Sequence, residues 1–231
     1  MSNFTMSSTT TIKPRTILSR ATQTVIYGAF EDVDNTEPVD VFIFDTPGID
    51  DISTVFDYRV WIRKIFQHME SLRALDAAVV LLPRDRKGGA FLKGVATAEI
   101  AQEWGWKIFR NYLWEKGPDF HRAKYVFQNV YVFRQGNMPT QIQSPIRYKD
   151  IIRLPDLADT REGTVAELPV PLIRLFLSLF DTDIVVMDPF AGSGSVAVAC
   201  EQLGIKKCYS IELDETRAFE IVERLKRKEL F

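Results

Sequence analysis

The sequence predicts an α/β fold, in which strands and helices alternate along one chain. Short apolar runs rich in β-branched residues recur, and segments with apolar residues at helical spacing separate several of them. One glycine-rich turn joins a strand directly to a helix. Because this alternation usually builds a mainly parallel sheet with helices on both faces, we expect that architecture. The 231 residues are enough for one such domain with a full core.

The first half of the chain shows the alternation in order. Residues 1–20 begin with a Ser/Thr-rich stretch that has no apolar core, which we interpret as a flexible tail rather than a secretory signal. The apolar patterns that follow predict two strands, a helix, a third strand and a second helix. These elements are expected at residues 24–27, 39–44, 58–75, 77–82 and 91–105.

The second half of the chain is expected to continue the sheet. Residues 106–114 and 125–133 alternate apolar and polar side chains, which predicts an antiparallel hairpin. Residues 136–166 have little pattern and are expected to be a connecting segment. A buried strand is then predicted at 184–187, followed by the glycine-rich turn, a helix and a last strand at 206–211.

The glycine-rich turn is the most informative motif of the chain. Gly192 and Gly194 allow a tight turn and the close approach of a ligand to the backbone. A helix begins at once, so its first amide groups point at the turn. Glu212 ends the next strand about 20 positions later, where nucleotide-binding βαβ units hold ribose hydroxyls. We therefore expect a nucleoside ligand; a turn that only packs a helix on the sheet is the alternative.

The amino-acid sequence of this turn resembles that of one family. Asp-Pro-Phe-Ala-Gly-Ser-Gly-Ser at 188–195 is similar to the S-adenosylmethionine loop of the DNA amino-methyltransferases, whose usual form is Asp-Pro-Phe-x-Gly-Ser-Gly-Thr. Residues 167–180 and 211–219 resemble the segments of that family before and after the loop. The resemblance implies S-adenosylmethionine as cofactor. It implies these binding residues: Asp188, Pro189, Phe190, Ala191, Gly192, Ser193, Gly194, Glu212 and Gly28.

The resemblance extends over nearly the whole chain. Residues 25–48 look like the opening strands of the family, and 105–116 with 125–133 look like its later hairpin. The catalytic segment precedes the cofactor loop, which is the order of the circularly permuted class called beta. This resemblance implies a Rossmann-like class I methyltransferase fold in one domain over residues 1–231. It also implies a mainly parallel sheet of seven strands with one antiparallel hairpin.

The segment Asp45-Thr46-Pro47-Gly48 stands where the family has a catalytic tetrad of Asp, Ser or Asn, then Pro-Pro and an aromatic residue. In the family, the first side chain and a backbone carbonyl accept the amino hydrogens of a flipped base, and the ring stacks on that base. The resemblance implies catalytic roles for Asp45, Thr46 and Pro47. This chain has Thr46 in place of the first proline and Gly48 in place of the ring.

Two groups of the family pattern are missing from this chain, and nearby residues could replace them. Phe44 or Phe56 could supply the missing ring from another direction. Upstream, the family usually has Gly-Asp, with its carboxylate near the cofactor adenine, whereas this chain has Ala29 after Gly28. A nearby carboxylate, Glu31 or Asp32, could take its place if the turn is shifted.

These features predict a methyltransferase acting on an exocyclic amino group of DNA. Adenine N6 is favoured over cytosine N4 because Asp45 opens the tetrad. The departures keep two alternatives open: an inactive subunit that pairs with an active methyltransferase, and an enzyme acting on RNA or another base. The family also suggests a homodimer. Phe44-Asp-Thr-Pro-Gly resembles a GTPase motif as well, but no phosphate loop precedes it.

Composition limits the setting and the partners. A net charge of −2 and 46% apolar residues are typical of a soluble protein, expected in the cytoplasm or nucleus and not in a membrane. The two cysteines are expected to be buried thiols, and no metal site is expected from two distant histidines. Basic residues cluster locally, and the cluster that begins at Arg224 is interpreted as a solvated helix face. The short 136–166 segment, in place of a large recognition region, suggests weak sequence selectivity or a second subunit that contacts DNA.

Overall fold

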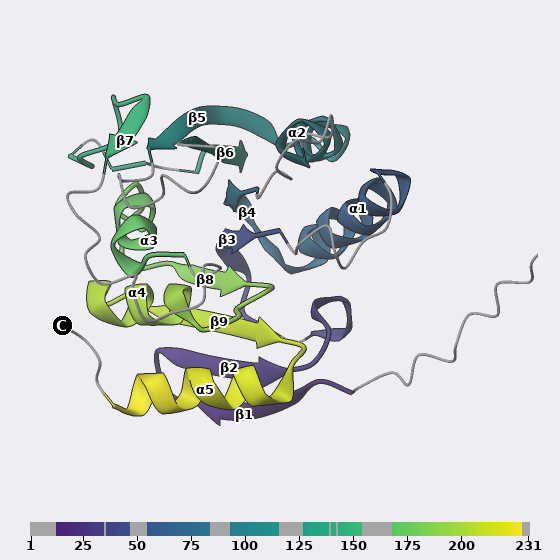
Figure 1. Cartoon of the computed structure of the whole chain (residues 1–231), viewed down its shortest axis with the longest axis vertical. Helices are drawn as coiled ribbons and strands as arrows, with labels where there is room; N and C mark the ends of the chain where they lie inside the picture. Colours follow the sequence, from purple (N-terminus) through teal and green to yellow (C-terminus); the bar gives the residue numbers. More distant parts are fainter. Residues whose placement is uncertain are drawn as a thin grey trace, which may run out of the picture.

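A computed structural model describes the chain over residues 13–34, 36–46, 55–83, 93–115, 127–138, 140–141, 143–153 and 168–227. Within these ranges, nine strands form one sheet in the order β1-β2-β9-β8-β3-β4-β6-β5-β7 (Figure 1). The strands are β1 (Arg15–Ser19), β2 (Gln23–Tyr27), β3 (Val39–Asp45), β4 (Arg73–Leu82), β5 (Lys107–Glu115), β6 (Phe127–Gln135), β7 (Ile151–Arg153), β8 (Val185–Asp188) and β9 (Lys207–Glu212). The helices are the short 3-10 helix η1 (Phe30–Asp32), α1 (Val55–Leu72), α2 (Lys93–Glu103), α3 (Val170–Leu177), α4 (Ser195–Leu203) and α5 (Glu215–Lys226).

The strand directions confirm a mainly parallel sheet, but it holds two antiparallel hairpins instead of the expected one, since β1 and β2 form a second. Strands β2, β9, β8, β3 and β4 are parallel neighbours, and their arrowheads point to one side where Figure 1 shows them best, in β2, β8 and β9. Strand β6 is antiparallel to both β4 and β5, so β5 and β6 form the predicted hairpin. Over the described ranges, no helix has both the length and the apolar character needed to cross a membrane.

The expected number of seven strands is wrong, because two further strands extend the edges of the sheet. Strand β1 pairs antiparallel with β2, although residues 15–19 were expected to belong to a tail. Strand β7 pairs with β5 inside the expected connecting segment. The side chains of β1 are exposed or half-buried, and β7 has only three residues. Neither strand therefore has the alternating apolar pattern by which a strand is found in a sequence.

The apolar alternation of the central strands separates two core layers. In β3, Phe42 and Phe44 belong to the cluster that α1 and α2 cover. Val41 and Ile43, one residue out of phase, belong to the cluster on the other face, which α3 and α4 cover. Because successive side chains of a strand point to opposite faces, a continuous apolar run indicates burial on both sides. The structure is therefore a three-layer α/β/α arrangement.

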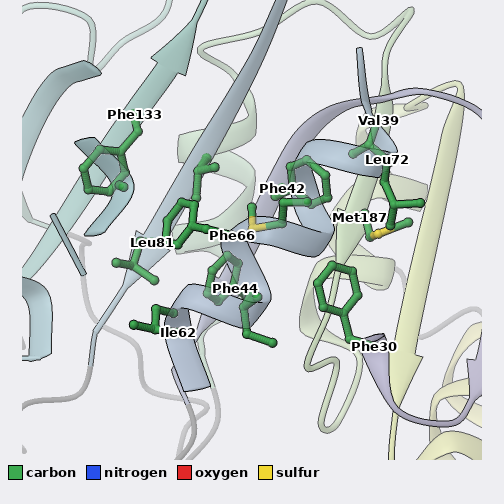
Figure 2. Close-up of a cluster of buried hydrophobic side chains, with 14 of the residues drawn as sticks. Phe30, Val39, Phe42, Phe44, Ile62, Phe66, Leu72, Leu81, Phe133 and Met187 are labelled. Atoms are coloured by element: carbon green, nitrogen blue, oxygen red, sulfur yellow. The ribbon is translucent and has the colours of Figure 1, made fainter. Parts of the chain in front are cut away.

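Figure 2 shows buried side chains of the core layer between the sheet and α1. Ile62 and Phe66 of α1 lie beside Phe44 of β3, and Phe30 and Met187 lie on the side of β8 and η1. These labelled side chains are almost completely shielded from solvent. The end of β3 is thus held by packing on a rigid layer, which limits how far its last residues can move.

One helix boundary differs from the sequence prediction. The apolar spacing predicts a helix over 58–75, but α1 ends at Leu72 and β4 begins at Arg73 with no intervening loop. Arg73 pairs with Val39 in the ladder between β3 and β4, and Leu75 is 86% exposed. Sheet pairing, which depends on a distant segment, therefore decided the conformation of these three residues.

The connections of the central strands create a switch in strand order. From β8 the chain passes through α4 to β9 on one side, whereas from β3 it passes through α1 to β4 on the other. Strands β3 and β8 are themselves parallel neighbours, with Val41 opposite Val186 and Phe42 opposite Met187. Open α/β sheets bind ligands beyond the carboxyl ends of the strands at such a point. The turn after β8 and the end of β3 lie at this point.

Candidate active site

The turn after β8 has the backbone geometry that its glycines predict. Gly192 and Gly194 have φ angles of 52° and 82°, and the Gly194 N–H donates to the carbonyl of Ala191 at 2.8 Å. A Cβ atom on Gly194 would lie 2.9 Å from Cγ2 of Ile221, so α5 packs closely against the turn. At Gly192 the nearest described atom, the carbonyl oxygen of Phe190, would be 4.0 Å from such a Cβ. The Gly192 side of the turn is therefore open among the described residues.

Glu212 connects the end of β9 to this turn. Its Oε2 atom accepts a hydrogen bond from the Gly192 N–H at 2.6 Å, and Oε1 accepts one from the Asp214 N–H at 2.9 Å. The carbonyl oxygen of Glu212 accepts from the Gly28 N–H at 3.0 Å. Three positions expected at the site, Gly28, Gly192 and Glu212, are therefore brought together at the carboxyl ends of β2, β8 and β9.

The other residues of the motif attach the turn to the neighbouring elements. Pro189 and Ala191 are buried, and the Ala191 N–H donates to the carbonyl of Ile211 at 2.8 Å. Ser193 is half-buried, and Arg224 of α5 donates from Nη1 to its carbonyl oxygen at 3.1 Å. The expectation that Arg224 lies on a solvated face is therefore wrong. Its only sequence signal is a position three residues after the apolar Ile221, on the buried side of α5.

Asp188 is a buried carboxyl group beside two other carboxyl groups. It is 4% exposed, and its Oδ1 atom accepts from the Phe190 N–H at 3.0 Å. Burial is the main cause that raises the pKa of Asp188 to about 8; the charges of Glu212 and Asp45 act in the same direction, and the hydrogen bond opposes them. Asp188 is therefore mostly protonated at neutral pH. The region has negative potential from Asp45 and Glu212, which favours a cationic ligand.

The raised pKa of Asp188 predicts a fall in stability with rising pH. The unfolded carboxyl releases its proton near the ordinary value of 3.8, whereas the folded one keeps it to about 8. The folded state binds more protons between these values, so the free energy of unfolding decreases as pH rises toward 8 and levels off above it. Urea unfolding between pH 5 and pH 9 measures this slope.

The matched variants for this measurement are Asp188→Asn and Asp183→Asn. The amide introduced by the first substitution cannot ionise, so that variant is expected to lose the part of the slope that ends near pH 8. Asp183 has a side chain that is 85% exposed, and its variant should keep the slope of the wild type. Equal slopes in all three proteins would contradict the assignment.

Asp45 and Thr46 lie at the end of β3, next to the turn. Asp45 is half-buried and pairs with Leu82 of β4 in the sheet. Thr46 is 2% exposed, and its Oγ1 atom has no hydrogen-bond partner among the described residues. Pro47 and Gly48 lie outside the described residues. Asp45 affects the pKa of Asp188, so the end of β3 and the turn share one electrostatic environment.

Aromatic rings gather on the α1 side of the turn. The ring centroid of Phe190 lies 5.6 Å from that of Phe44, 6.2 Å from that of Phe30 and 5.3 Å from that of Trp61. Phe44 is fully buried, so it cannot replace the ring missing at position 48. Trp61 was not expected at the site, because it fits the apolar spacing of α1 that indicates a core residue. Ala29, η1 and its exposed acidic residues follow Gly28 at the neighbouring edge.

Both cysteines, Cys200 and Cys208, are buried free thiols, as expected. Burial raises the pKa of Cys200 well above its ordinary value, and the neighbouring Cys208 raises it further. The two thiols pack in the layer under α4, away from solvent. They are therefore core residues of low reactivity.

Comparison with solved structures shows the same fold in DNA methylases. The DNA methyltransferase PvuII, which is cytosine-N4-specific, is 14% identical with a TM-score of 0.71, covering 88% of this chain and 86% of that one. TTHA0409 of Thermus thermophilus, assigned as a DNA modification methylase, is 17% identical with a TM-score of 0.68, covering 88% and 94%. Its complex with S-adenosyl-L-methionine matches with a TM-score of 0.66 at 17% identity, covering 87% and 92%. The complex of M1.HpyAVI with SAM is 18% identical with a TM-score of 0.59, covering 82% and 89%.

At the level of sequence, a search of curated proteins found no match. The family model N6_N4_Mtase, described as DNA methylase, matches residues 46–223, which is more than half of the chain. The matched region begins at Thr46, directly after β3, and extends through the turn after β8 into α5. This chain belongs to the N6_N4_Mtase family of DNA methylases.

Proposed function

We propose that the protein is an S-adenosylmethionine-dependent DNA methyltransferase that acts on an exocyclic amino group, with adenine N6 favoured over cytosine N4. The proposal depends on one observation: the carboxyl-terminal ends of strands β8 and β3 are adjacent in the sheet. Strand β8 delivers the glycine-rich turn and its parallel neighbour β3 delivers Asp45. A cofactor on the turn and a base beside Asp45 would share one site at the switch in strand order.

The turn suits S-adenosylmethionine for three reasons. The open side of Gly192 leaves room for the methionine part of the cofactor. Glu212 ends β9 with a carboxylate that can accept hydrogen bonds from ribose hydroxyls. The carboxylates of Asp45 and Glu212 favour a ligand with a positive sulfonium group. The structures of TTHA0409 and M1.HpyAVI with this cofactor support the choice.

Asp45 would hold the target amino group. A methyltransferase that acts on a base takes it out of the duplex and reads its Watson–Crick edge by hydrogen bonds. Asp45 and the backbone carbonyl of Thr46 or Pro47 would accept the two amino hydrogens, so that the nitrogen lone pair faces the methyl group. No general base is needed early, since the nitrogen becomes acidic only after methyl transfer. In this scheme the chain acts as a single domain of the circularly permuted beta class.

A second candidate function is an inactive subunit that pairs with an active methyltransferase and helps it bind nucleic acid. The sequence departures at Gly48 and Ala29 favour it, because both remove groups that contact ligands in the resembled family. The two candidates predict the same cofactor site. They differ in whether the isolated chain transfers a methyl group.

The deciding experiment incubates the purified full chain with tritiated S-adenosylmethionine and unmethylated DNA, with RNA in a parallel reaction. Digestion to nucleosides and chromatography then locates the label. We expect label in N6-methyladenine from DNA. Label in N4-methylcytosine would correct the choice of base, and label in RNA alone would overturn DNA as the substrate. If the isolated chain binds the cofactor but transfers no methyl group, the result would favour the inactive subunit.

A further inference from the structure

The proposed reaction needs a surface on which the extruded base can stack, and Trp61 of α1 is the candidate for it. A flipped base loses its stacking neighbours in the duplex, and enzymes replace them with aromatic or apolar side chains. Position 48, directly after the proposed catalytic segment, is a glycine and offers no ring. If the proposed function holds, an aromatic or apolar side chain from elsewhere in the chain would provide this surface.

Trp61 packs against the turn after β8. It belongs to α1, the helix that follows β3, and its ring centroid lies 5.3 Å from that of Phe190 in the turn after β8. The planes of these two rings are inclined by 42°. Phe190 in turn contacts Phe44, the residue before Asp45, with ring centroids 5.6 Å apart. Trp61 therefore packs against the turn after β8 and is linked to Phe44 of β3 through Phe190, and it is only half-buried.

The other rings of this cluster are unavailable for stacking. Phe44 and Tyr58 are fully buried, and Phe30 is 2% exposed. The hydroxyl group of Tyr58 is also bound to Oγ1 of Thr97 at 2.7 Å, which fixes the ring in the interface between α1 and α2. Tyr58 packs against Trp61 with ring centroids 5.8 Å apart.

Phe56 is exposed on the same helix but on a different side. It is 72% exposed, and it precedes Trp61 by five residues. Five residues correspond to a rotation of about 140° around an α-helix, so the two side chains leave α1 in different directions. The ring contacts of Trp61 with Phe190 show which side of α1 faces the turn. Phe56 is thus a suitable control rather than a candidate.

We propose that Trp61 supplies the aromatic surface on which the target base stacks after it leaves the duplex. This inference rests on the proposed function and adds the residue that replaces the missing ring. Stacking on tryptophan depends little on which base is bound, because every base has a π face. Trp61 would contribute to binding of the extruded base, while Asp45 would determine which edge of that base is read.

The test compares Trp61→Leu, Trp61→Phe and Phe56→Ala with the wild type. Methyl transfer to unmethylated plasmid DNA gives kcat/KM, and calorimetry with S-adenosylmethionine gives the cofactor affinity. We expect Trp61→Leu to lower kcat/KM for DNA by roughly ten- to a hundredfold, the range found when one stacking ring is lost. Trp61→Phe keeps a ring and should retain most of the activity. Phe56→Ala and the cofactor affinity of every variant should match the wild type.

A fluorescence measurement keeps the proposal testable if Trp61→Leu fails to fold. Adding DNA in the presence of cofactor should quench part of the tryptophan emission of the wild type, and the Trp61→Phe protein should lack that part. An active wild type whose kcat/KM and quenching do not depend on Trp61 would overturn the inference. A loss of cofactor affinity in Trp61→Leu would also overturn it, since the ring would then belong to the cofactor site. An inactive wild type would instead contradict the proposed function.

Discussion

Replacing Asp45 by alanine is expected to lower kcat for methyl transfer by at least about a hundredfold, the usual cost of removing one preorganised partner of a reacting group. Asp45 ends β3 directly after the buried Phe44, and its charge acts on Asp188 at the start of the turn. Without it, one amino hydrogen of the target base has no acceptor, and the lone pair is no longer aimed at the methyl group. The cofactor site on the turn after β8 should remain intact.

The measurement for Asp45 combines single-turnover methyl transfer with cofactor affinity. Asp45→Asn keeps one carbonyl acceptor and should lose less activity than Asp45→Ala. Asp34→Ala, which changes an exposed carboxylate before β3, is the matched control and should behave like the wild type. Because the charge of Asp45 raises the pKa of Asp188, Asp45→Ala should also move the pH dependence of stability to lower pH. Full turnover by Asp45→Ala would refute the assigned role.

Replacing Glu212 by alanine is expected to weaken the binding of S-adenosylmethionine by roughly ten- to a hundredfold, which corresponds to the loss of charged hydrogen bonds to the ligand. The substitution removes the acceptor of the Gly192 and Asp214 N–H groups as well. The turn would thus lose its connection to β9 at the same time as the proposed ribose contact. We expect both effects to lower cofactor affinity in the same direction.

Calorimetric titration with S-adenosylmethionine measures this prediction. Glu212→Gln separates the two contributions, because its carbonyl oxygen can still accept one backbone N–H while the charge is lost. Glu220→Ala on the exposed side of α5 is the control and should leave the affinity unchanged. An unaltered affinity in Glu212→Ala would show that the cofactor does not contact the end of β9.

The strands of the sheet show which parts of a fold a sequence reveals. Strands β3 and β8 are buried on both faces, so their apolar runs were recognisable without knowledge of their neighbours. Strands β1 and β7 are edge strands whose formation depends on pairing with β2 and β5. Residues 73–75 likewise follow the ladder with β3 rather than their own apolar spacing. Local pattern therefore predicted the central strands and missed the edges.

The same division holds for the site. The glycine-rich turn and Glu212 were predicted because the positive φ angles and the βαβ spacing depend on residues close together in the sequence. Trp61 and Arg224 were missed because each reaches the turn from a different helix. The roles of the site residues remain predictions until the variants above are measured.

The sequence alone determined the α/β class, the central strands, the glycine-rich turn and its resemblance to the DNA amino-methyltransferases, since all of these follow from local pattern and composition. Only the tertiary structure decided that β3 and β8 are neighbours, that the carboxyl groups of Asp45, Asp188 and Glu212 interact, and that Trp61 lies against Phe190. These facts depend on the pairing order of the sheet and on helix packing. Both join segments far apart along the chain, and no local pattern specifies them.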